Sequence, residues 1–405
     1  MNSLPAPRYF DRRTPPHVTT LVFMAGTGAM AMNIFLASLP EMARYYDQSY
    51  PVMQIALTGF LMLTSLCQLI IGPLSDRYGR RPVILVALMI FIVASIGAAN
   101  STLFEVFMFF RLVQAVIVAG MVISRASVRD MVAREQAASM LGYIAMGMAL
   151  APMMAPALGG FLADLYGWQS NFHALTLIGF VVLIVVFFDQ GETNQHQSSS
   201  FAEQFKAYPE LIRSRRFWGY ALVLAFSIGT FFAYVGGAPF VGDRFYGLSA
   251  SQVGLYLGLT PMGYMIGSGI SGRFSRRIGL YRMMIIGGSI IFFGMLPTLI
   301  TAWLEVQHPM GFFAFTIMIG LGNGLVQPAA NAGLLDVRPQ IAGSAAGLGG
   351  ALMTMGGAGL TALSGSLLSD DSGLYPLIFC VLATSFISLM ASIYTIRVER
   401  SVRGS

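Results

Sequence analysis

The eleven residues from Gly72 to Pro82 read GPLSDRYGRRP, and a second stretch that begins at Gly272 reads GRFSRRIGLYR. The two stretches share four residues at one constant offset, since Gly72, Ser75, Arg77 and Gly79 match Gly272, Ser275, Arg277 and Gly279. A second match joins Ala137, Ser139 and Gly142 to Ala342, Ser344 and Gly347. Each match is short, but together they recur at equivalent points, which predicts two related halves.

Long stretches without Asp, Glu, Lys or Arg surround these motifs. A helix needs about 20 apolar residues to cross a hydrocarbon layer of about 30 Å. Twelve segments are long enough: 18–40, 51–75, 82–100, 102–124, 136–163, 165–188, 217–242, 245–272, 283–304, 309–335, 339–369 and 372–396. Only the fourth contains charged residues, Glu105 and Arg111.

The composition agrees with this reading. Of the 405 residues, 56% are hydrophobic and 10% are charged, against roughly 45–50% and about 25% in a soluble chain. We therefore predict an all-α membrane protein with twelve transmembrane helices in two pseudo-symmetric six-helix halves. The longest internal polar stretch, 189–216, is the expected cytoplasmic linker, between an N-terminal half at 1–188 and a C-terminal half at 217–405.

Basic residues indicate the orientation, because cytoplasmic loops retain Lys and Arg. If the N-terminus is inside, 21 of the 24 Lys and Arg residues fall on the cytoplasmic side. We expect a multi-pass protein of the bacterial inner (plasma) membrane with both termini in the cytoplasm and no cleaved signal peptide. The net charge of +6 then reflects topology, and no nucleic-acid partner is expected.

The GPLSDRYGRRP stretch, between the second and third segments, resembles the loop signature of the major facilitator superfamily. Its glycines allow a tight turn, and Asp76 can pair with a nearby Arg side chain. The resemblance implies a gating loop that latches the halves together, whereas a solvated turn without a gate is the alternative. The residues of this loop are Gly72, Asp76, Arg77, Gly79, Arg80 and Arg81.

Arg111 opens the sequence RLVQAVIVAGMVISRASVRDMV, which resembles the fourth-span arginine motif of drug/proton antiporters. The RASVRD stretch and the YGWQSNF segment resemble the bicyclomycin-resistance-type (Bcr/CflA) subfamily. The fifth segment contains ALAPMMAPALGG, which resembles the antiporter motif, although Ala151 stands where a glycine is usual. The resemblance implies rocking contacts between the halves there, and simple close packing is the alternative; the residues are Pro152, Pro156, Gly159 and Gly160.

Several polar residues inside the segments are candidates for a substrate cavity. An arginine at mid-depth costs about 2.5–3.5 kcal/mol, so Arg111 is expected either to face the cavity or to clamp backbone carbonyls. Asn323, Gln327 and Asn331 recur every four residues and predict an amide stripe on one helix face. The other candidates are Asn33, Gln114, Tyr234 and Tyr264.

The coupling proton lacks an obvious site. The subfamily commonly carries an acidic residue in the first span, but this sequence has Asn33 there, and an amide cannot carry a proton at neutral pH. Glu105 and His173 are weak candidates. For both, an ordinary place at the membrane interface is the alternative.

The resemblance implies a secondary active transporter that exports drug-like or toxic small molecules by alternating access, with the proton gradient as the energy source. A facilitator or importer of a polar metabolite stays open, as does a non-transporting membrane receptor or sensor. Clustered His, Cys and carboxylate residues and the phosphate-loop pattern are missing from the sequence, so we expect no enzyme activity, cofactor or metal. The expected partners are a small-molecule substrate and the lipid bilayer, and the chain is expected to be a monomer.

Overall fold

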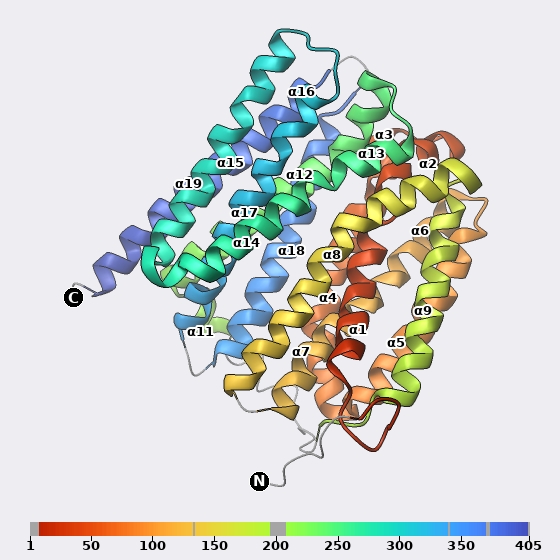
Figure 1. Cartoon of the computed structure of the whole chain (residues 1–405), viewed down its shortest axis with the longest axis vertical. Coiled ribbons are helices and arrows are strands. Elements are labelled where there is room, and N and C mark those ends of the chain that lie inside the picture. Colours follow the sequence, from red (N-terminus) through yellow and green to blue (C-terminus); the bar gives the residue numbers. More distant parts are fainter. Residues whose placement is uncertain (1–7, 133, 195–207, 339–340, 370–372, 404–405) are drawn as a thin grey trace.

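The computed structural model describes residues 8–132, 134–194, 208–338, 341–369 and 373–403. Within these ranges the chain forms long helical rods that run side by side (Figure 1). Some rods are single helices, and others contain a short break. The predicted twelve helices in two six-helix halves are confirmed.

The first half contains six rods. They are α1 (Val18–Asn33) with η1 (Leu36–Ser38) and α2 (Leu39–Tyr45); α3 (Tyr50–Met53) with α4 (Ile55–Tyr78); α5 (Arg80–Ala99); α6 (Phe104–Val113) with η2 (Gln114–Val118) and α7 (Ala119–Met131); α8 (Arg134–Tyr166); and α9 (Gln169–Asp189).

The second half also contains six rods, which follow the short helix α11 (Tyr208–Ile212). Its rods are α12 (Arg215–Tyr246); α13 (Ala250–Leu257) with α14 (Leu259–Ile278); α15 (Leu280–Trp303); α16 (Met310–Phe313) with η3 (Ala314–Thr316) and α17 (Ile317–Asp336); α18 (Ala342–Ser366); and α19 (Tyr375–Arg403). Within the described ranges, ten rods are long and apolar enough by themselves to cross a membrane. The other two rods are α8 and α13 with α14.

The two halves share one internal arrangement. In the first, α1 packs against α7, α8 and α9; in the second, its counterpart α12 packs against α17, α18 and α19. The halves meet where α13 packs on α8 and α18 packs on α4. The second rod of each half therefore packs on the fifth rod of the other. The predicted domain boundaries stay a prediction, because residues 195–207 of the linker lie outside the described ranges.

The matched glycines of the repeat occupy equivalent turns. Gly79 separates α4 from α5 with φ +95° and ψ 153°, and Gly279 separates α14 from α15 with φ +86° and ψ 150°. Only glycine adopts this backbone region without strain. The repeat seen in the sequence thus marks two copies of one structural turn.

Within the described ranges, short 3₁₀ segments interrupt three rods, namely η1, η2 and η3 in the first, fourth and tenth rods. Such segments inside a longer helix often mark a hinge or a strained site. These breaks were not predicted from the sequence. They lie on the rods that carry Asn33, Arg111 and the amide stripe.

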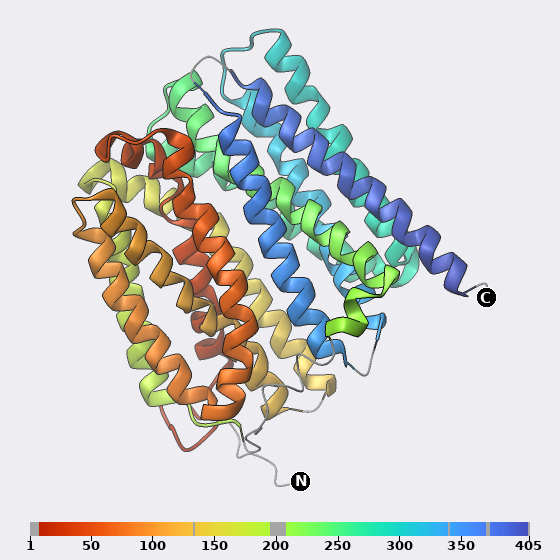
Figure 2. The same cartoon turned by 180° about the vertical axis from the view of Figure 1, so that it is seen from behind.

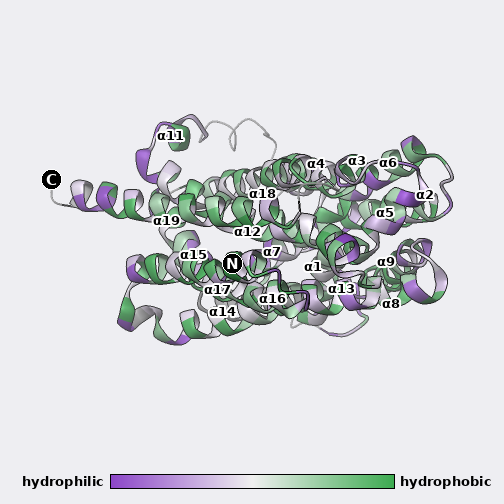
Figure 3. Ribbon diagram, turned by 90° about the horizontal axis from the view of Figure 1, so that it is seen from above, coloured by the Kyte–Doolittle hydropathy of each residue, from purple (hydrophilic) through white to green (hydrophobic). Residues whose placement is uncertain are grey.

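The two broad ends of the bundle need names. The terminal face is the side where α1 begins and α19 ends, and the far face is the side where α2, α8 and α12 end. Figure 1 places α2, α3 and α13 together at the far face, and Figure 2 views the same arrangement from behind. Hydrophilic residues gather at helix ends and on α11, whereas hydrophobic residues cover the helix sides (Figure 3).

The start of the chain is tied to the end of α9 through the buried carboxylate of Asp189. Its Oδ1 accepts from the backbone N–H of Phe10 at 2.9 Å, and its Oδ2 accepts from the N–H of His17 at 2.9 Å. The hydroxyl of Thr20 donates to the same Oδ2 at 2.7 Å. This carboxylate therefore joins the first and last rods of the first half.

Candidate functional site

Arg111 lies in the last turn of α6, directly before η2, and its side chain is fully buried. Its Nε donates to the carbonyl of Ala56 at 3.1 Å, and one guanidinium nitrogen donates to Oε1 of Gln114 at 2.8 Å. The guanidinium carbon lies 4.2 Å from the ring centre of Phe35 and 4.0 Å from that of Phe60. Each such cation–π contact contributes about 2 kcal/mol when it is desolvated. Arg111 therefore clamps a backbone carbonyl and is enclosed by two aromatic rings.

Gln114 extends this network towards α5. Its Nε2 donates to the hydroxyl of Ser95 at 2.8 Å, and that hydroxyl donates to the carbonyl of Phe91 at 2.7 Å. The second guanidinium nitrogen of Arg111, Nη2, is buried and has no hydrogen-bond partner among the described residues. An unpaired buried donor costs about 1–3 kcal/mol. An acceptor on a ligand would remove that cost.

Asn33 is the last residue of α1 and is 2% exposed. Its Nδ2 donates to the carbonyl of Ala29 on its own helix at 2.7 Å. Two residues later, Phe35 stacks on Arg111. The chain that follows α1 therefore reaches Arg111 through Phe35, and a shared site for Asn33 and Arg111 stays a prediction.

The three amides of the predicted stripe on α17 differ in burial. Asn323 is buried and its Oδ1 accepts a hydrogen bond from the hydroxyl of Ser227 on α12. The side-chain nitrogens of Asn323 and Gln327 are buried without a partner among the described residues. Asn331, one turn closer to the terminal face, is exposed. Two of the three amides thus have unpaired donors inside the second half, and the role of the stripe in cavity lining stays a prediction.

The two predicted tyrosines differ in environment. Tyr234 on α12 is fully buried, and its hydroxyl lies near the side chains of Thr260 and Thr316 without completing a hydrogen bond of good geometry. Tyr264 on α14 is half-buried, and its backbone lies against Gly320 of α17. Tyr234 therefore belongs to the interior of the second half, and Tyr264 belongs to the α14–α17 contact.

The GPLSDRYGRRP loop forms an ion-pair cluster at the terminal face. One guanidinium nitrogen of Arg80 lies 2.5 Å from the carboxylate of Asp76 and donates to the hydroxyl of Ser75 at 2.6 Å. Its Nε lies 3.2 Å from the carboxylate of Asp130 on α7. Asp76 pairs with a nearby arginine, as predicted, and this cluster joins α4, α5 and α7 of one half.

The other loop residues have separate surroundings. Arg81 donates to the carbonyl of Phe187 on α9 at 2.9 Å. Arg77 is exposed, and Gly72 is half-buried in α4 with open space where a Cβ would be.

Glu192, which follows α9, binds this loop and was not predicted from the sequence. Its carboxylate accepts from the backbone N–H groups of Arg80 at 2.9 Å and of Arg81 at 3.1 Å, which are unpaired donors at the start of α5. A Cβ at Gly79 would lie 2.5 Å from Glu192 Oε2. Gly79 therefore supplies both the turn and the space for this carboxylate. Glu192 is an acid in a polar stretch, so no pattern in the sequence distinguished it.

The antiporter-like residues lie in the second part of α8. Pro152 and Pro156 are inside the helix, which continues past both. Gly159 and Gly160 face different neighbours, since a Cβ on the first would collide with the carbonyl of Ile34 and a Cβ on the second with the carbonyl of Ala250. Gly159 thus allows close packing within the first half, and Gly160 allows close packing on the second half.

Polar contacts also join the halves at the far face. Arg44 of α2 forms a 2.7 Å ion pair with Asp243 of α12. The carboxylate of Asp164 on α8 accepts from the backbone N–H groups of Ala250 at 3.2 Å and Ser251 at 3.1 Å. These groups surround a pocket of about 280 Å³. In the sequence, Arg44 is one of the three basic residues that do not fall on the expected cytoplasmic side.

A second set of contacts also joins the two halves. The hydroxyl of Tyr50 donates to the carbonyl of Gly236 at 2.6 Å, and the buried amide of Gln54 fits against Gly236 and Gly365. By contrast, the ion pairs given for the described part of the terminal face do not join the halves. Those of Arg80 lie within the first half, and the pair between Arg338 and Glu210 joins the second half to α11 of the linker. Among the described residues, charged groups therefore join the halves at the far face.

The weak proton-site candidates lie apart from the buried residues. Glu105 is in the first turn of α6 and His173 is near the start of α9, so both lie towards the far face, and both side chains are exposed. Neither is part of the network around Arg111. Their role as a proton site stays a prediction.

A sequence profile of the Major Facilitator Superfamily matches residues 21–362. The chain belongs to the Major Facilitator Superfamily. Among superfamily members it is 31% identical to an uncharacterized MFS-type transporter, YdgK, of Bacillus subtilis, over 85% of this chain and 87% of that protein. It is 27% identical to a bicyclomycin resistance protein homolog of Haemophilus influenzae, over 92% of this chain and 96% of that protein.

A solved superfamily structure shows the same fold. It is a bacterial homolog of the human lysosomal transporter Spinster in an inward-facing, occupied conformation, with a TM-score of 0.73 and 15% identity over 95% of this chain and 96% of that one. The predicted family is confirmed, including the likeness to bicyclomycin-resistance proteins. The protein is a multi-pass membrane transporter with bacterial relatives, which places it in an inner membrane.

Proposed function

We propose that this protein exports drug-like or toxic small molecules by alternating access, as a monomer coupled to the proton gradient. The observation that carries the proposal is that, among the described residues, the charged contacts between the halves lie at the far face. Arg44, Asp164 and Asp243 join the halves there, whereas the ion pairs given for the described part of the terminal face do not cross between the halves. Such an arrangement suits a transporter that is open towards the terminal face.

The terminal face is then the cytoplasmic side. The distribution of basic residues supports this orientation, since cytoplasmic loops are rich in Lys and Arg. A carrier open to the cytoplasm is ready to collect a solute for export. The name of the Haemophilus influenzae relative, a bicyclomycin resistance protein homolog, supports a drug-like substrate.

The substrate is proposed to contact polar groups that lack partners in the two halves. They are Nη2 of Arg111 in the first half and the side-chain nitrogens of Asn323 and Gln327 in the second. A solute with acceptor oxygens would pair with these donors, and the aromatic rings of Phe35 and Phe60 would contact its apolar part. Neutral or anionic amphipathic molecules fit this set of groups.

Proton coupling needs a titratable group between the halves. Asn33 cannot supply it, and Glu105 and His173 are exposed. Among the described residues, the carboxylates that line the far-face pocket are Glu41, Asp164 and Asp243. Under antiport, a proton taken up at Asp164 or Asp243 would weaken the contacts that close the far face.

The test is uptake into proteoliposomes driven by an imposed pH gradient, with a panel of antibiotics and dyes. Wild type is compared with Arg111→Ala and with Asn33→Asp. Asn100→Asp is a matched control for the latter, because Asn100 also donates to a carbonyl of its own helix, at 2.8 Å, but is exposed. Gradient-driven uptake by wild type and its loss in Arg111→Ala are expected. Mere equilibration of every compound would contradict antiport.

The second candidate is a facilitator or importer of a polar metabolite, and Asn33 in place of an acid favours it. If only Asn33→Asp responds to the gradient and Asn100→Asp does not, this candidate replaces antiport. A non-transporting receptor or sensor is distinguished by growth. Cells that overproduce an exporter tolerate more of its substrate, whereas cells that overproduce a sensor do not.

A further inference from the structure

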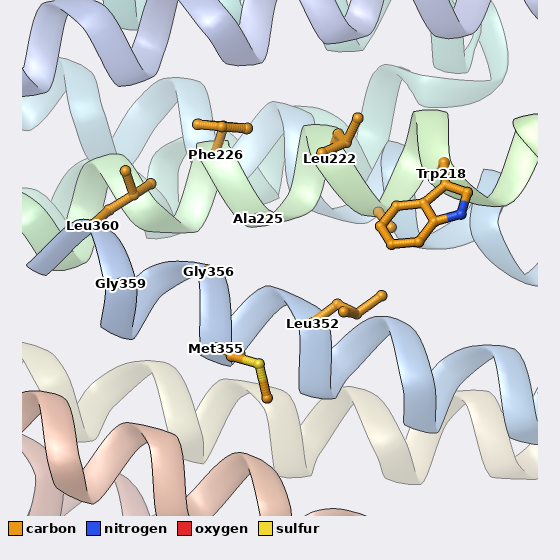
Figure 4. A pocket seen from close by; sticks show the side chains of 10 residues that line it. Trp218, Leu222, Ala225, Phe226, Leu352, Met355, Gly356, Gly359 and Leu360 are labelled. Carbon is orange, nitrogen blue, oxygen red and sulfur yellow. The ribbon is translucent and has the colours of Figure 1, made fainter. Parts of the chain in front are cut away.

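A groove with a volume of about 410 Å³ lies between α12 and α18 and is separate from the residues discussed above. Trp218 lies at its end near the terminal face, and Leu360 lies at the other end (Figure 4). From Trp218 to Phe226 it follows α12 for about 12 Å, at about 1.5 Å per residue. Its apolar lining includes Leu222 on α12 and Met355 and Gly359 on α18.

The groove opens towards the bilayer. Trp218, Leu222 and Met355 are each exposed on rods that cross the membrane. The indole nitrogen of Trp218 already donates to the carbonyl of Ile212 at 2.7 Å, so the lining offers no free polar side chain. At Gly359 no atom lies within 4 Å of the position of a Cβ. The occupant of this groove must therefore be apolar and must come from the hydrocarbon layer.

A positive charge lies at the end of the groove near the terminal face. Arg215 is the first residue of α12 and precedes Trp218 by three positions and Leu222 by seven, a spacing that places all three on one helix face. The side chains of Arg215 and of its neighbour Arg213 are exposed. The groove thus combines an apolar channel with a cation at the depth of the lipid headgroups.

We propose that this groove binds one anionic phospholipid of the leaflet at the terminal face. An acyl chain lies between α12 and α18, and the headgroup phosphate pairs with Arg215. Arginine is well suited to phosphate because its planar fork donates two parallel hydrogen bonds. Since α18 also packs on α4 of the other half, the bound lipid supports a helix that joins the halves.

Trp218 provides a direct readout, because the chain has three tryptophans. Trp168 is 1% exposed and is out of reach of a quencher in the lipid, so replacing Trp303 by Phe leaves Trp218 as the accessible fluorophore. The full-length Trp303→Phe protein is reconstituted in phosphatidylcholine vesicles that contain a small fraction of brominated phosphatidylglycerol or, separately, brominated phosphatidylcholine. Bromine quenches indole fluorescence only on contact.

The expected result is stronger quenching by the anionic lipid at equal fractions. Arg215→Gln should lower the preference for the anionic lipid by about fivefold, the effect of one basic residue at an anionic surface, whereas Arg273→Gln, an exposed arginine on α14, should not. Gly359→Leu should fill the groove and reduce quenching by both lipids. Gly347→Leu is its matched control, because Gly347 also has open space around it but lies on another face of α18.

Equal quenching by the two lipids would overturn the proposal, since the groove would then hold bulk acyl chains without recognising a headgroup. A preference that survives Gly359→Leu would also overturn it, because the anionic lipid would bind elsewhere. Loss of quenching as the protein-to-lipid ratio rises would assign the groove to a second copy of the chain. Displacement by a transported compound would assign it to a lipophilic solute.

Discussion

Replacing Gly160 by Ala should open the far face. Gly160 contacts the backbone of α13 so closely that a Cβ would collide with the carbonyl of Ala250 and lie 2.8 Å from Cα of Ser251. Ordinary contact begins at 3.4 Å, so the two helices must separate by at least several tenths of an ångström. Backbone atoms cannot rotate away as a flexible side chain can.

The magnitude follows from this collision. Overpacking in a close contact costs about 1–3 kcal/mol, and here the cost applies only while α8 and α13 are together. The ratio of open to closed far face should therefore rise about 5- to 150-fold. The gain in helix propensity from Gly to Ala, about 1 kcal/mol, acts in both states and cancels.

The assay is labelling of a cysteine at Ala163, which is 5% exposed and lines the far-face pocket. The native thiols, Cys67 and Cys380, are first replaced by Ser and Ala. A membrane-impermeant maleimide should then label Gly160→Ala faster than the parent. The control is Gly26→Ala in α1, where no atom lies within 4 Å of a Cβ.

Equal labelling rates in Gly160→Ala and Gly26→Ala, with both variants folded, would refute the reasoning. The contact between α8 and α13 would then belong to a static interface. Its closeness would reflect packing alone, which was the alternative for these glycines.

Further variants test the other contacts. Arg44→Gln should speed the same labelling by up to about fivefold, because an exposed ion pair contributes about 0–1 kcal/mol; Arg338→Gln removes a pair of the same 2.7 Å length between the second half and α11, and an equal effect there would argue against a role for Arg44 between the halves. Arg111→Lys should abolish transport and lower the melting temperature, since an ammonium cannot both stack between two rings and bond the Ala56 carbonyl and Gln114; unchanged transport would remove Arg111 from the site. Gly79→Ala should lower the free energy of unfolding by about 1–3 kcal/mol in thermal denaturation, through its positive φ and the collision with Glu192, and a neutral result would mean that Glu192 does not occupy this position.

Apolar length and internal repetition were enough to predict the fold. The segments from 18–40 to 372–396 became the rods of the bundle because a hydrocarbon environment requires backbone groups to bond within each helix. The matched glycines at 79 and 279 became equivalent turns, because both have a positive φ that other residues adopt only with strain. The 3₁₀ breaks were not predicted. Pro40 follows η1 and has no N–H to bond the carbonyl of Leu36, but no proline marks η2 in the sequence.

The sequence could identify a site residue only where that residue alone is costly to place inside the membrane. Arg111 is such a residue, and its buried guanidinium bonds the carbonyl of Ala56, the clamp that was one of the two alternatives; its role in binding a substrate stays a prediction. Phe35 and Phe60 could not be selected, because the chain contains 30 phenylalanines and only the packing of α1, α4 and α6 brings these two around a cation.

The amide stripe shows a limit of helical spacing. Residues four apart advance by about 400°, so the face turns by about 40° at each step. From Asn323 to Asn331 this amounts to about 80°, which agrees with the change from a buried to an exposed side chain. Spacing identified the helix face at Asn323 and Gln327 but not its continuation.

The carboxylate of Asp189 has a consequence for biosynthesis. A ribosome delivers the chain from the N-terminus, so residues 10–20 lack this acceptor until Asp189 emerges at the end of the sixth rod. Only then can the N–H groups of Phe10 and His17 and the hydroxyl of Thr20 find their acceptor. The first six rods can therefore form these hydrogen bonds before the rods of the second half are complete. The second half then packs against a first half that is already folded.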